Sequence, residues 1–426
     1  DLALRSLKRN PVLTALMVVA IALGIGASMT TLTVMHVLSG DPLPGRSSTL
    51  YAPQLDPRDI NNFQTHDEPP DQVTWIDGMN LLQAKRASRQ ALMTGGSVAI
   101  QPAASTLDPF YETARYTTAD FFPMFGVPFQ YGHAWTASED ADAANVVVIS
   151  NKLNKKLFMG ADSRDRMLRV EGHALRVIGV LGDWRPNPHF YDLNVKNYGG
   201  DEGVYLPLST SQVLHLTHLG GADCWGNGGA DATPAAPCVW LQFWVQLNTP
   251  TQAAAYRQFL IHYSEEQKSL GRFQRPPNVR LRNLMAWLDY ERVVPGDVRL
   301  QTWLALGFLC VCLVNTLGLM LAKFLRRSGD LSVRRALGAS RRALFMQLLV
   351  ESGLIGVFGG AGGLLLAGLG LWLVRRQSTD YASLAHLDGA MLLTTFLLAL
   401  ACGLTAGLLP AWRACHVAPA LQLKSN

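Results

Sequence analysis

The sequence predicts an α-helical membrane protein with four transmembrane helices and a large α+β domain between the first and the second helix. Four runs without Asp, Glu, Lys or Arg exceed the ~18 residues that separate a membrane span from a core helix. They are Val12–Gly40, Leu300–Ala322, Ser352–Val374 and Gly389–Trp412. The long segment between the first two runs has instead the short alternating and periodic patterns of a folded α+β domain.

Charge predicts the orientation of these helices. Residues 38–299 carry 23 Lys and Arg against 27 Asp and Glu, whereas the rest of the chain has a net charge of +9. Because cations near short loops stay in the cytoplasm, the large segment is expected outside. Arg375 and Arg376 fall on the outer side, where we interpret them as interfacial side chains. The first run is about twice as long as the apolar core of a signal peptide, so we expect an uncleaved anchor.

Within the large segment, helices and strands are predicted in mixed order. Residues 40–70 are rich in Pro, Asp and Ser, which indicates an extended entry from the membrane. The expected helices are 72–87, 151–158 and 251–270, and the expected strands are 90–101, 110–117, 144–150, 173–184, 239–248 and 278–284. This order favours two lobes, with residues of about 118–248 inserted into the other lobe.

Two aromatic clusters leave their role open. Phe121, Phe122, Phe125 and Phe129 can line a hydrophobic groove, although such side chains more often form the core. A second cluster lies on a loop interrupted by proline, where contact with a partner and burial are equally compatible with the sequence. It contains Trp184, His189, Phe190 and Tyr191.

The cysteines fit an oxidising outer compartment. Cys224 and Cys238 bracket a loop rich in Gly, Ala and Pro, and such a pair predicts a disulfide. Closing a loop of ~15 residues contributes about 3 kcal/mol in the chain-entropy model. The alternative is a metal site with His215, His218 and Asp223, but this spacing matches no standard zinc pattern, and we expect no metal.

The sequence lacks the motifs of common enzymes. It has no Gly-Lys dipeptide and hence no P-loop, and neither G-x-S-x-G nor H-E-x-x-H occurs. We therefore expect a non-catalytic chain without a bound cofactor. Glu351 directly precedes the third apolar run, and we interpret it as a structural partner of nearby arginines rather than as a proton relay.

Glycine pairs in the third and fourth runs predict close helix packing rather than nucleotide binding, because these runs lie in lipid. The pairs are Gly356 with Gly360, Gly359 with Gly363, and Gly403 with Gly407.

The most unusual stretch lies between the second and third runs, at residues 323–347. It reads KFLRRSGDLSVRRALGASRRALFMQ and holds seven cations and one carboxylate, in a chain whose net charge is +5. Attraction to anionic lipid explains the sign of this charge. It does not explain the small residues and the glycine among the arginines.

The stretch DLSVRRALGASRRALFMQLLVESGLIGVFGGAGG closely resembles the signature of MacB/FtsX-type ABC transporter permeases, the mechanotransmission (type VII) family. Three other regions agree in order. LALRSLKRNPVLTALMVVAIALGIG is similar to the family's amphipathic N-terminal helix and first span. TTADFFPMFGVPFQYGHAW with NVVVISNKLNKKLFMG resembles its periplasmic core domain, and PAWRACHVAPALQLK its closing motif.

The resemblance, together with the charge pattern, implies a complete domain plan. We expect a cytoplasmic amphipathic helix at 1–11, a span at 12–38, a MacB-like periplasmic core domain of porter-like and inserted lobes at 39–299, a span at 300–325, a cytoplasmic coupling helix at 326–342, a span at 343–374, a periplasmic loop at 375–389, a span at 390–412, and a cytoplasmic tail at 413–426.

In the family, the coupling helix docks on a separate ATPase subunit, which binds ATP and Mg²⁺. The resemblance assigns this role to Asp330, Leu331, Val333, Arg334, Arg335, Ala336, Leu337, Gly338, Ala339 and Arg341. Ser332 stands where the family usually has glycine. This difference affects the expected docking geometry but not the resemblance to this class of permeases. The implied partners are the ATPase, a second permease that is identical or a sibling, a periplasmic membrane fusion protein with an outer-membrane channel, and membrane lipid. No nucleic acid is expected.

The function implied by the resemblance is that of a permease subunit in a bacterial inner membrane, which passes ATPase motion to its periplasmic domain to drive export. An alternative within the family is lipoprotein extraction or regulation of a cell-wall hydrolase. An alternative of another class is a membrane-anchored sensor without an ATPase.

Overall fold

The computed structural model describes residues 11–60, 68–102, 108–195, 197–198, 201–226, 233–327, 329, 333–335, 337–377 and 389–416. The chain separates into two compact units. Residues 40–293 form an α+β domain, and the segments on either side of it form a helical unit. Each unit is described by itself.

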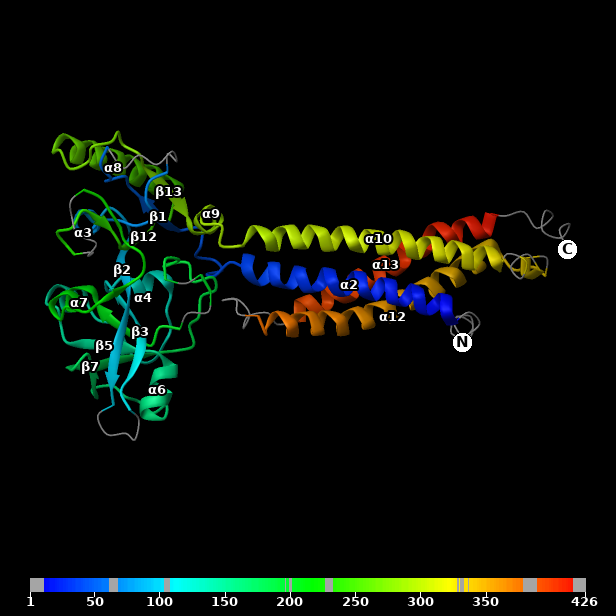
Figure 1. The fold of residues 1–426 in the computed structure, drawn as a ribbon, viewed down its shortest axis with the longest axis horizontal. Helices are drawn as coiled ribbons and strands as arrows, with labels where there is room; N and C mark the ends of the chain where they lie inside the picture. The colour runs from blue at the N-terminus through cyan, green and yellow to red at the C-terminus, as the bar shows by residue number, and fades with distance from the viewer. Residues whose placement is uncertain are drawn as a thin grey trace. The chain divides into compact units, whose positions relative to one another are not determined.

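The helical unit contains four helices that are long and apolar enough to cross a membrane. They are α2 (Pro11–Ser39), α10 (Gly296–Arg326), α12 (Arg341–Val374) and α13 (Gly389–His416). The four helices lie side by side (Figure 1). Met17, Ile21 and Ile25 of α2 form a buried cluster with side chains of the other three helices. At 1.5 Å per residue, helices of this length exceed the ~30 Å hydrocarbon layer.

The two predicted glycine pairs of α12 lie on different faces of this helix, and the third pair lies in α13. A Cβ atom on Gly356 would lie 2.8 Å from the Cα atom of Gly403 in α13, and one on Gly360 would lie 2.3 Å from the Cβ atom of Ala399. The other face meets α2, where Cβ atoms on Gly359 and Gly363 would contact Ile21 and Ile25. Gly407 of α13 packs against Ser352 in the same way. The absence of side chains at these positions therefore allows α12 to approach two neighbours at once.

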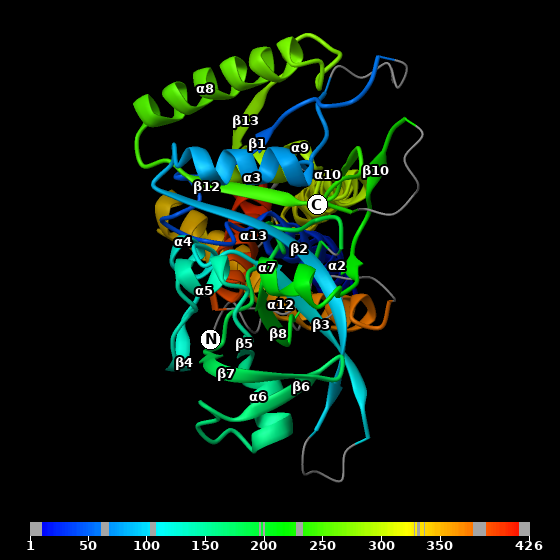
Figure 2. The ribbon, with the colours of Figure 1, turned by 90° about the vertical axis from the view of Figure 1, so that its left-hand side faces the viewer.

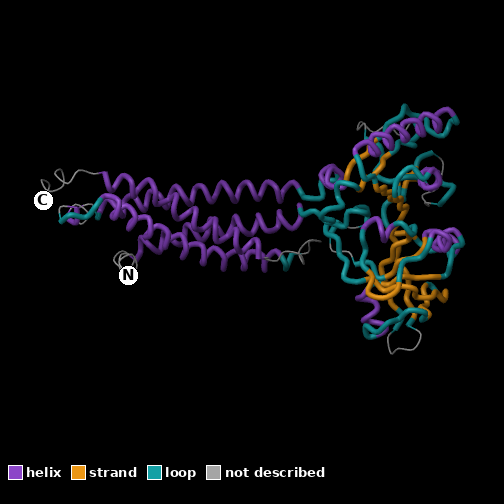
Figure 3. The backbone as a smooth tube through the Cα atoms, turned by 180° about the vertical axis from the view of Figure 1, so that it is seen from behind, coloured by secondary structure: helices purple, strands orange, loops and turns teal. Residues whose placement is uncertain are grey.

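The α+β domain holds the strands of the described residues (Figure 3). Its strands are β1 (Leu50–Gln54), β2 (Arg89–Gln101), β3 (Phe110–Thr117), β4 (Phe129–Gly132), β5 (Val146–Ile149), β6 (Met167–Val170), β7 (His173–Leu181), β8 (Val204–Pro207), β9 (His218–Leu219), β10 (Asp223–Cys224), β11 (Cys238–Val239), β12 (Gln242–Gln246) and β13 (Arg280–Asn283). Its helices are α3 (Trp75–Ala84), α4 (Phe121–Phe125), α5 (Ala137–Ala141), α6 (Asn151–Phe158), α7 (Leu208–Val213), α8 (Pro250–Ser269) and α9 (Leu284–Tyr290).

One sheet runs through the whole domain in the order β13-β1-β12-β2-β3-β8-β5-β7-β4. The long strand β2 connects its two parts. Residues Arg89–Met93 pair with β12, and Met93–Ile100 pair with β3. Figure 2 shows β2 running from beside α3 toward α6. Strand β12 falls within the segment 118–248, which the sequence favours as an inserted lobe, yet it pairs between β1 and β2. The sheet is therefore continuous across that boundary.

Strand β1 lies inside the segment 40–70, for which the sequence predicts only an extended entry. It pairs antiparallel with β13 from Tyr51 to Gln54, and its Pro53 lies opposite Leu281. Proline lowers the strand signal of a short sequence, because it cannot donate to a sheet ladder. Strand β1 therefore depends on its pairing with β13, which lies far along the chain, rather than on its own sequence pattern.

For all side chains of the two aromatic clusters except Phe129 and Trp184, which are half-buried, the structure decides the open question in favour of the core. Phe121, Phe122 and Phe125 are buried in α4. His189, Phe190 and Tyr191 are also buried, while Trp184 stays partly exposed. The ring of Phe125 meets that of Phe190 edge to face with centroids 5.0 Å apart, a favourable geometry for aromatic pairs. The loop interrupted by proline thus packs onto α4 instead of presenting its aromatic side chains to a partner.

Candidate functional site

The stretch expected to couple with an ATPase connects α10 to α12. Asp330, Leu331 and Ala336 lie outside the described residues. Residues 333–335 form a helical turn that ends at Gly338, since the N–H of Leu337 donates to Val333 O at 3.0 Å and that of Ala339 to Arg334 O at 3.0 Å. Gly338 has φ +99°, a left-handed conformation that terminates helices and favours glycine.

This turn presents apolar and basic side chains together. Val333 is 52% exposed and Leu337 is 83% exposed, and they stand four residues apart on one side of the turn. Arg334 and Arg341 are exposed beside them, and Arg334 Nη1 donates to Gln347 Oε1 at 3.3 Å. Exposed apolar side chains among arginines are typical of a protein contact surface, because arginine and buried apolar anchors dominate binding energy at interfaces.

After the turn, α12 begins at a well-defined cap. Ser340 is its N-cap, and the Ser340 Oγ atom accepts the N–H of Ala343 at 3.2 Å. Such a cap stabilises a helix by ~1 kcal/mol. The turn is therefore joined to α12 by two residues, Ala339 and Ser340.

A buried ion pair joins the two helices that flank the turn. Lys323 Nζ of α10 lies 2.6 Å from Glu351 Oε1 of α12, and the two side chains are 0% and 1% exposed. Arg327 Nη1 lies 3.5 Å from the other carboxylate oxygen, Oε2. Lys323 Nζ also donates to Thr14 Oγ1 of α2 at 3.4 Å. This charge cluster therefore connects three of the four helices.

Sequence reasoning identified Glu351 but not its principal partner. We expected arginines, and the structure places Lys323 nearer than Arg327. Lys323 ends an apolar run and is followed by arginines, so it resembles an ordinary interfacial cation. Buried charges in membranes are almost always paired. An acid at the start of one span and a lysine at the end of the preceding span could therefore have indicated this ion pair.

Cys224 and Cys238 are joined in a disulfide across the pair of strands β10 and β11. The two cysteines face each other in the ladder, and the bond closes the loop between them. Among the described residues, no group of three His, Cys, Asp or Glu could hold a metal ion. His218 instead packs its ring against that of Trp240, with centroids 5.1 Å apart.

A second charged cluster is buried inside the α+β domain. Arg115 of β3 is fully buried, and it contacts Asp192 at 2.6 Å and also the carboxylate of Glu202. Burial alone would raise the pKa of Glu202, but the Arg115 guanidinium and His189 lower it to about 2. Tyr191 donates its hydroxyl to Glu202 Oε2 at 3.0 Å. These contacts hold Tyr191, Asp192 and Glu202 against Arg115 of β3.

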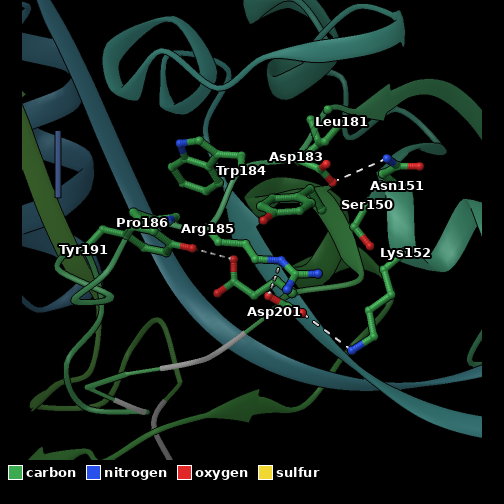
Figure 4. Close-up of a pocket in the computed structure, with 13 residues that line it drawn as sticks. Ser150, Asn151, Lys152, Leu181, Asp183, Trp184, Arg185, Pro186, Tyr191 and Asp201 are labelled. Carbon is green, nitrogen blue, oxygen red and sulfur yellow. Dashed lines mark hydrogen bonds and ion pairs between the residues drawn. The ribbon is translucent and has the colours of Figure 1, made fainter. Parts of the chain in front are cut away.

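A small surface cleft lies beside this cluster. Figure 4 shows Lys152 and Arg185 approaching Asp201 from different segments, at 3.5 Å and 3.2 Å. The cleft holds about 30 Å³, which suffices for water but not for a substrate. Its side chains therefore close the surface above the buried cluster.

Two family profiles match the chain. The MacB-like periplasmic core domain matches residues 14–260, and the FtsX-like permease C-terminal region matches residues 303–419. The pyoverdine export ATP-binding/permease protein PvdT of Pseudomonas aeruginosa is 25% identical over 72% of this chain and 41% of its own length. The macrolide export ATP-binding/permease protein MacB 1/2 of Paracoccus denitrificans is 33% identical over 72% of this chain and 41% of its own length.

The chain thus spans about two fifths of the length of the curated relatives it matches. Among solved structures, the periplasmic region of MacB from Actinobacillus actinomycetemcomitans is similar at 14% identity, with 60% of this chain and 96% of that chain covered and a TM-score of 0.37.

Proposed function

The chain belongs to the family of ABC transporter permeases that carry a MacB-like periplasmic core domain and an FtsX-like C-terminal region, and on this basis we propose that it is a permease subunit that transmits ATPase motion to its periplasmic domain. The motion drives export of a substrate from the periplasm across the outer part of the envelope. The observation that carries the proposal is the coupling turn, with Val333 and Leu337 exposed among arginines.

The proposal includes the partners that such a subunit requires. ATP and Mg²⁺ bind to an ATPase subunit, and two permeases, identical or sibling, pair in the bacterial inner membrane. A membrane fusion protein and an outer-membrane channel continue the path. Similar proteins are named for the export of macrolides and of pyoverdine, which supports export as the direction of transport.

The buried ion pair supports the mechanical part of the proposal. The coupling turn is attached to α10 and α12, and the contact between Lys323 and Glu351 fixes these two helices to each other close to the turn. A push on the turn by the ATPase then moves both helices together instead of separating them. Long helices are stiff elements, so they carry this displacement across the membrane.

Charge reversal in the coupling turn tests the proposal. The double variant Arg334→Glu/Arg335→Glu should lose stimulation of ATP hydrolysis when it is reconstituted with its ATPase subunit in lipid nanodiscs, because it places two carboxylates on a basic docking surface. We expect a loss of at least tenfold, as for a lost interface charge contact.

The matched control is Arg375→Glu/Arg376→Glu, which makes the same charge change at the opposite end of α12. It should keep most of the stimulation. Equal stimulation in the coupling variant and the unmodified protein would contradict the proposed role of the turn. The amount of inserted permease is measured in each sample, so that a failure of insertion is not mistaken for a failure of coupling.

A further inference from the structure

The α+β domain contains a pocket of about 610 Å³, remote in sequence from the coupling turn. It lies among α3, α5, α7 and the beginning of β2. Its size falls within the range of 300–1,000 Å³ that is usual for small-molecule sites. Nothing in the coupling role of the helical unit uses this pocket.

The wall of the pocket is largely apolar and is held in place from behind. Trp75, Met79 and Leu82 come from α3, and Leu208 from α7 faces the same space. The indole of Trp75 is stacked on that of Trp240, with ring centroids 6.1 Å apart and planes at 12°. A wall of this kind is preformed, so an apolar ligand would bind with little cost of ordering side chains.

Three side chains of the pocket offer oxygen atoms that can accept a hydrogen bond. Gln90 is only 6% exposed, and its Nε2 atom donates to Leu82 O at 3.1 Å, while its Oε1 atom has no hydrogen-bond partner. Leaving a buried acceptor unpaired costs about 1–3 kcal/mol. The carboxylates of Asp120 and Asp140 also line the pocket, where Asp120 accepts the N–H of Gln90 and Asp140 accepts the N–H groups of Ala119 and of the Trp135 indole. The cation of Lys85 lies at the exposed edge of the pocket. The Oε1 atom of Gln90 is covered in this conformation, and because Gln90 lines the pocket, a turn of its side chain would bring the oxygen to a ligand that donates a hydrogen bond.

From this combination we propose that the pocket binds a small apolar amine, with its apolar body against Trp75 and Leu208 and its ammonium group toward Gln90 and the two carboxylates. Burial, together with the neighbouring Asp120, raises the pKa of Asp140 to about 7. A bound cation would stabilise the ionised form of this carboxylate. The orphan oxygen and the two acids favour a cation over an anion of the same size.

Fluorescence titration of the full-length protein in nanodiscs tests the proposal, with dansylcadaverine as the cationic probe and dansylglycine as its anionic counterpart. The signal of empty nanodiscs is subtracted. We expect dansylcadaverine to bind with a Kd on the order of 10 μM, as for a ligand of its size, and dansylglycine at least tenfold more weakly.

Two variants locate the binding. Gln90→Leu removes the unpaired acceptor and should weaken dansylcadaverine about tenfold. Its matched control is Gln242→Leu on the adjoining strand β12, since Gln242 is equally buried and also has an unpaired Oε1 atom but does not line the pocket. Ala141→Trp, at an exposed position on the rim, narrows the pocket without changing a core residue and should weaken dansylcadaverine binding at least tenfold.

Two results would overturn the proposal. One is equal affinity for the cationic and the anionic probe. The other is unchanged dansylcadaverine binding in Ala141→Trp, a variant that keeps the test valid even if Gln90→Leu fails to fold. Because the readout is binding alone, its outcome is independent of whether the coupling turn stimulates an ATPase.

Discussion

The ion pair between Lys323 and Glu351 gives a quantitative test of how α10 and α12 are held together. At an effective dielectric constant of about 20, charges 2.6 Å apart attract by roughly 6 kcal/mol, and removing both ions from water costs a comparable amount. The pair as a whole therefore contributes little net stability. Removing only one partner leaves the other charge buried without a counter-charge, which lowers the free energy of unfolding by about 3–5 kcal/mol.

We predict that Glu351→Gln lowers the free energy of unfolding of the helical unit by about 3–5 kcal/mol, whereas Lys323→Met/Glu351→Leu stays within about 1 kcal/mol of the unmodified protein. Steric trapping in bicelles measures both values under the same conditions. Glu265→Gln serves as a control, because this exposed side chain of α8 makes the same chemical change outside the helical unit. Unaltered stability in Glu351→Gln would refute the reasoning, since it would mean that Lys323 is solvated without its partner.

Two further predictions concern packing and pH. Gly356→Val should destabilise the helical unit by about 1–3 kcal/mol in the same assay, because its side chain would collide with α13. The control is Gly368→Ala, where no atom of a neighbouring segment lies within 4 Å of the added Cβ. This variant should be neutral or stabilising. The pKa of Glu202 is about 2 in the folded protein, below its ordinary value of 4.5, so the unfolded chain binds more protons between these values. The free energy of unfolding of the domain should therefore fall as the pH falls from 4.5 through 2. Glu202→Gln should reduce this dependence on pH, as measured by urea unfolding followed by circular dichroism. An unchanged dependence would contradict the low pKa of Glu202.

Those parts of the fold whose signal is local could be predicted from the sequence. Uninterrupted apolar runs indicated the regions of α2, α10, α12 and α13, and strands 90–101 and 110–117 correspond to β2 and β3. For these elements, the length and composition of the segment indicate which element forms. The bounds of α3 are narrower than the expected 72–87, because Thr74 caps the helix with its side chain and Lys85 ends it in a left-handed conformation.

Features that depend on distant partners could not be predicted in the same way. Strand β1 forms by pairing with β13. Tyr191 is buried through contacts with Phe121 and Arg115. The role of Lys323 follows from its ion pair with Glu351. The large pocket combines residues 75–90, 118–141 and 208–212, which no spacing rule brings together. In each case the decisive contact spans the sequence, so local propensity carries little information about it.

The two bare faces of α12 have a mechanical consequence. Helices with large side chains interlock as ridges in grooves, and moving one along its axis requires these ridges to be lifted out of register. Glycines such as Gly356 and Gly359 instead leave notches, which the backbone of α13 and the Ile21 side chain of α2 occupy. A shift of α12 along its axis would bring larger residues of α12 against these groups. The two glycine faces therefore fix the axial position of α12 against both neighbours.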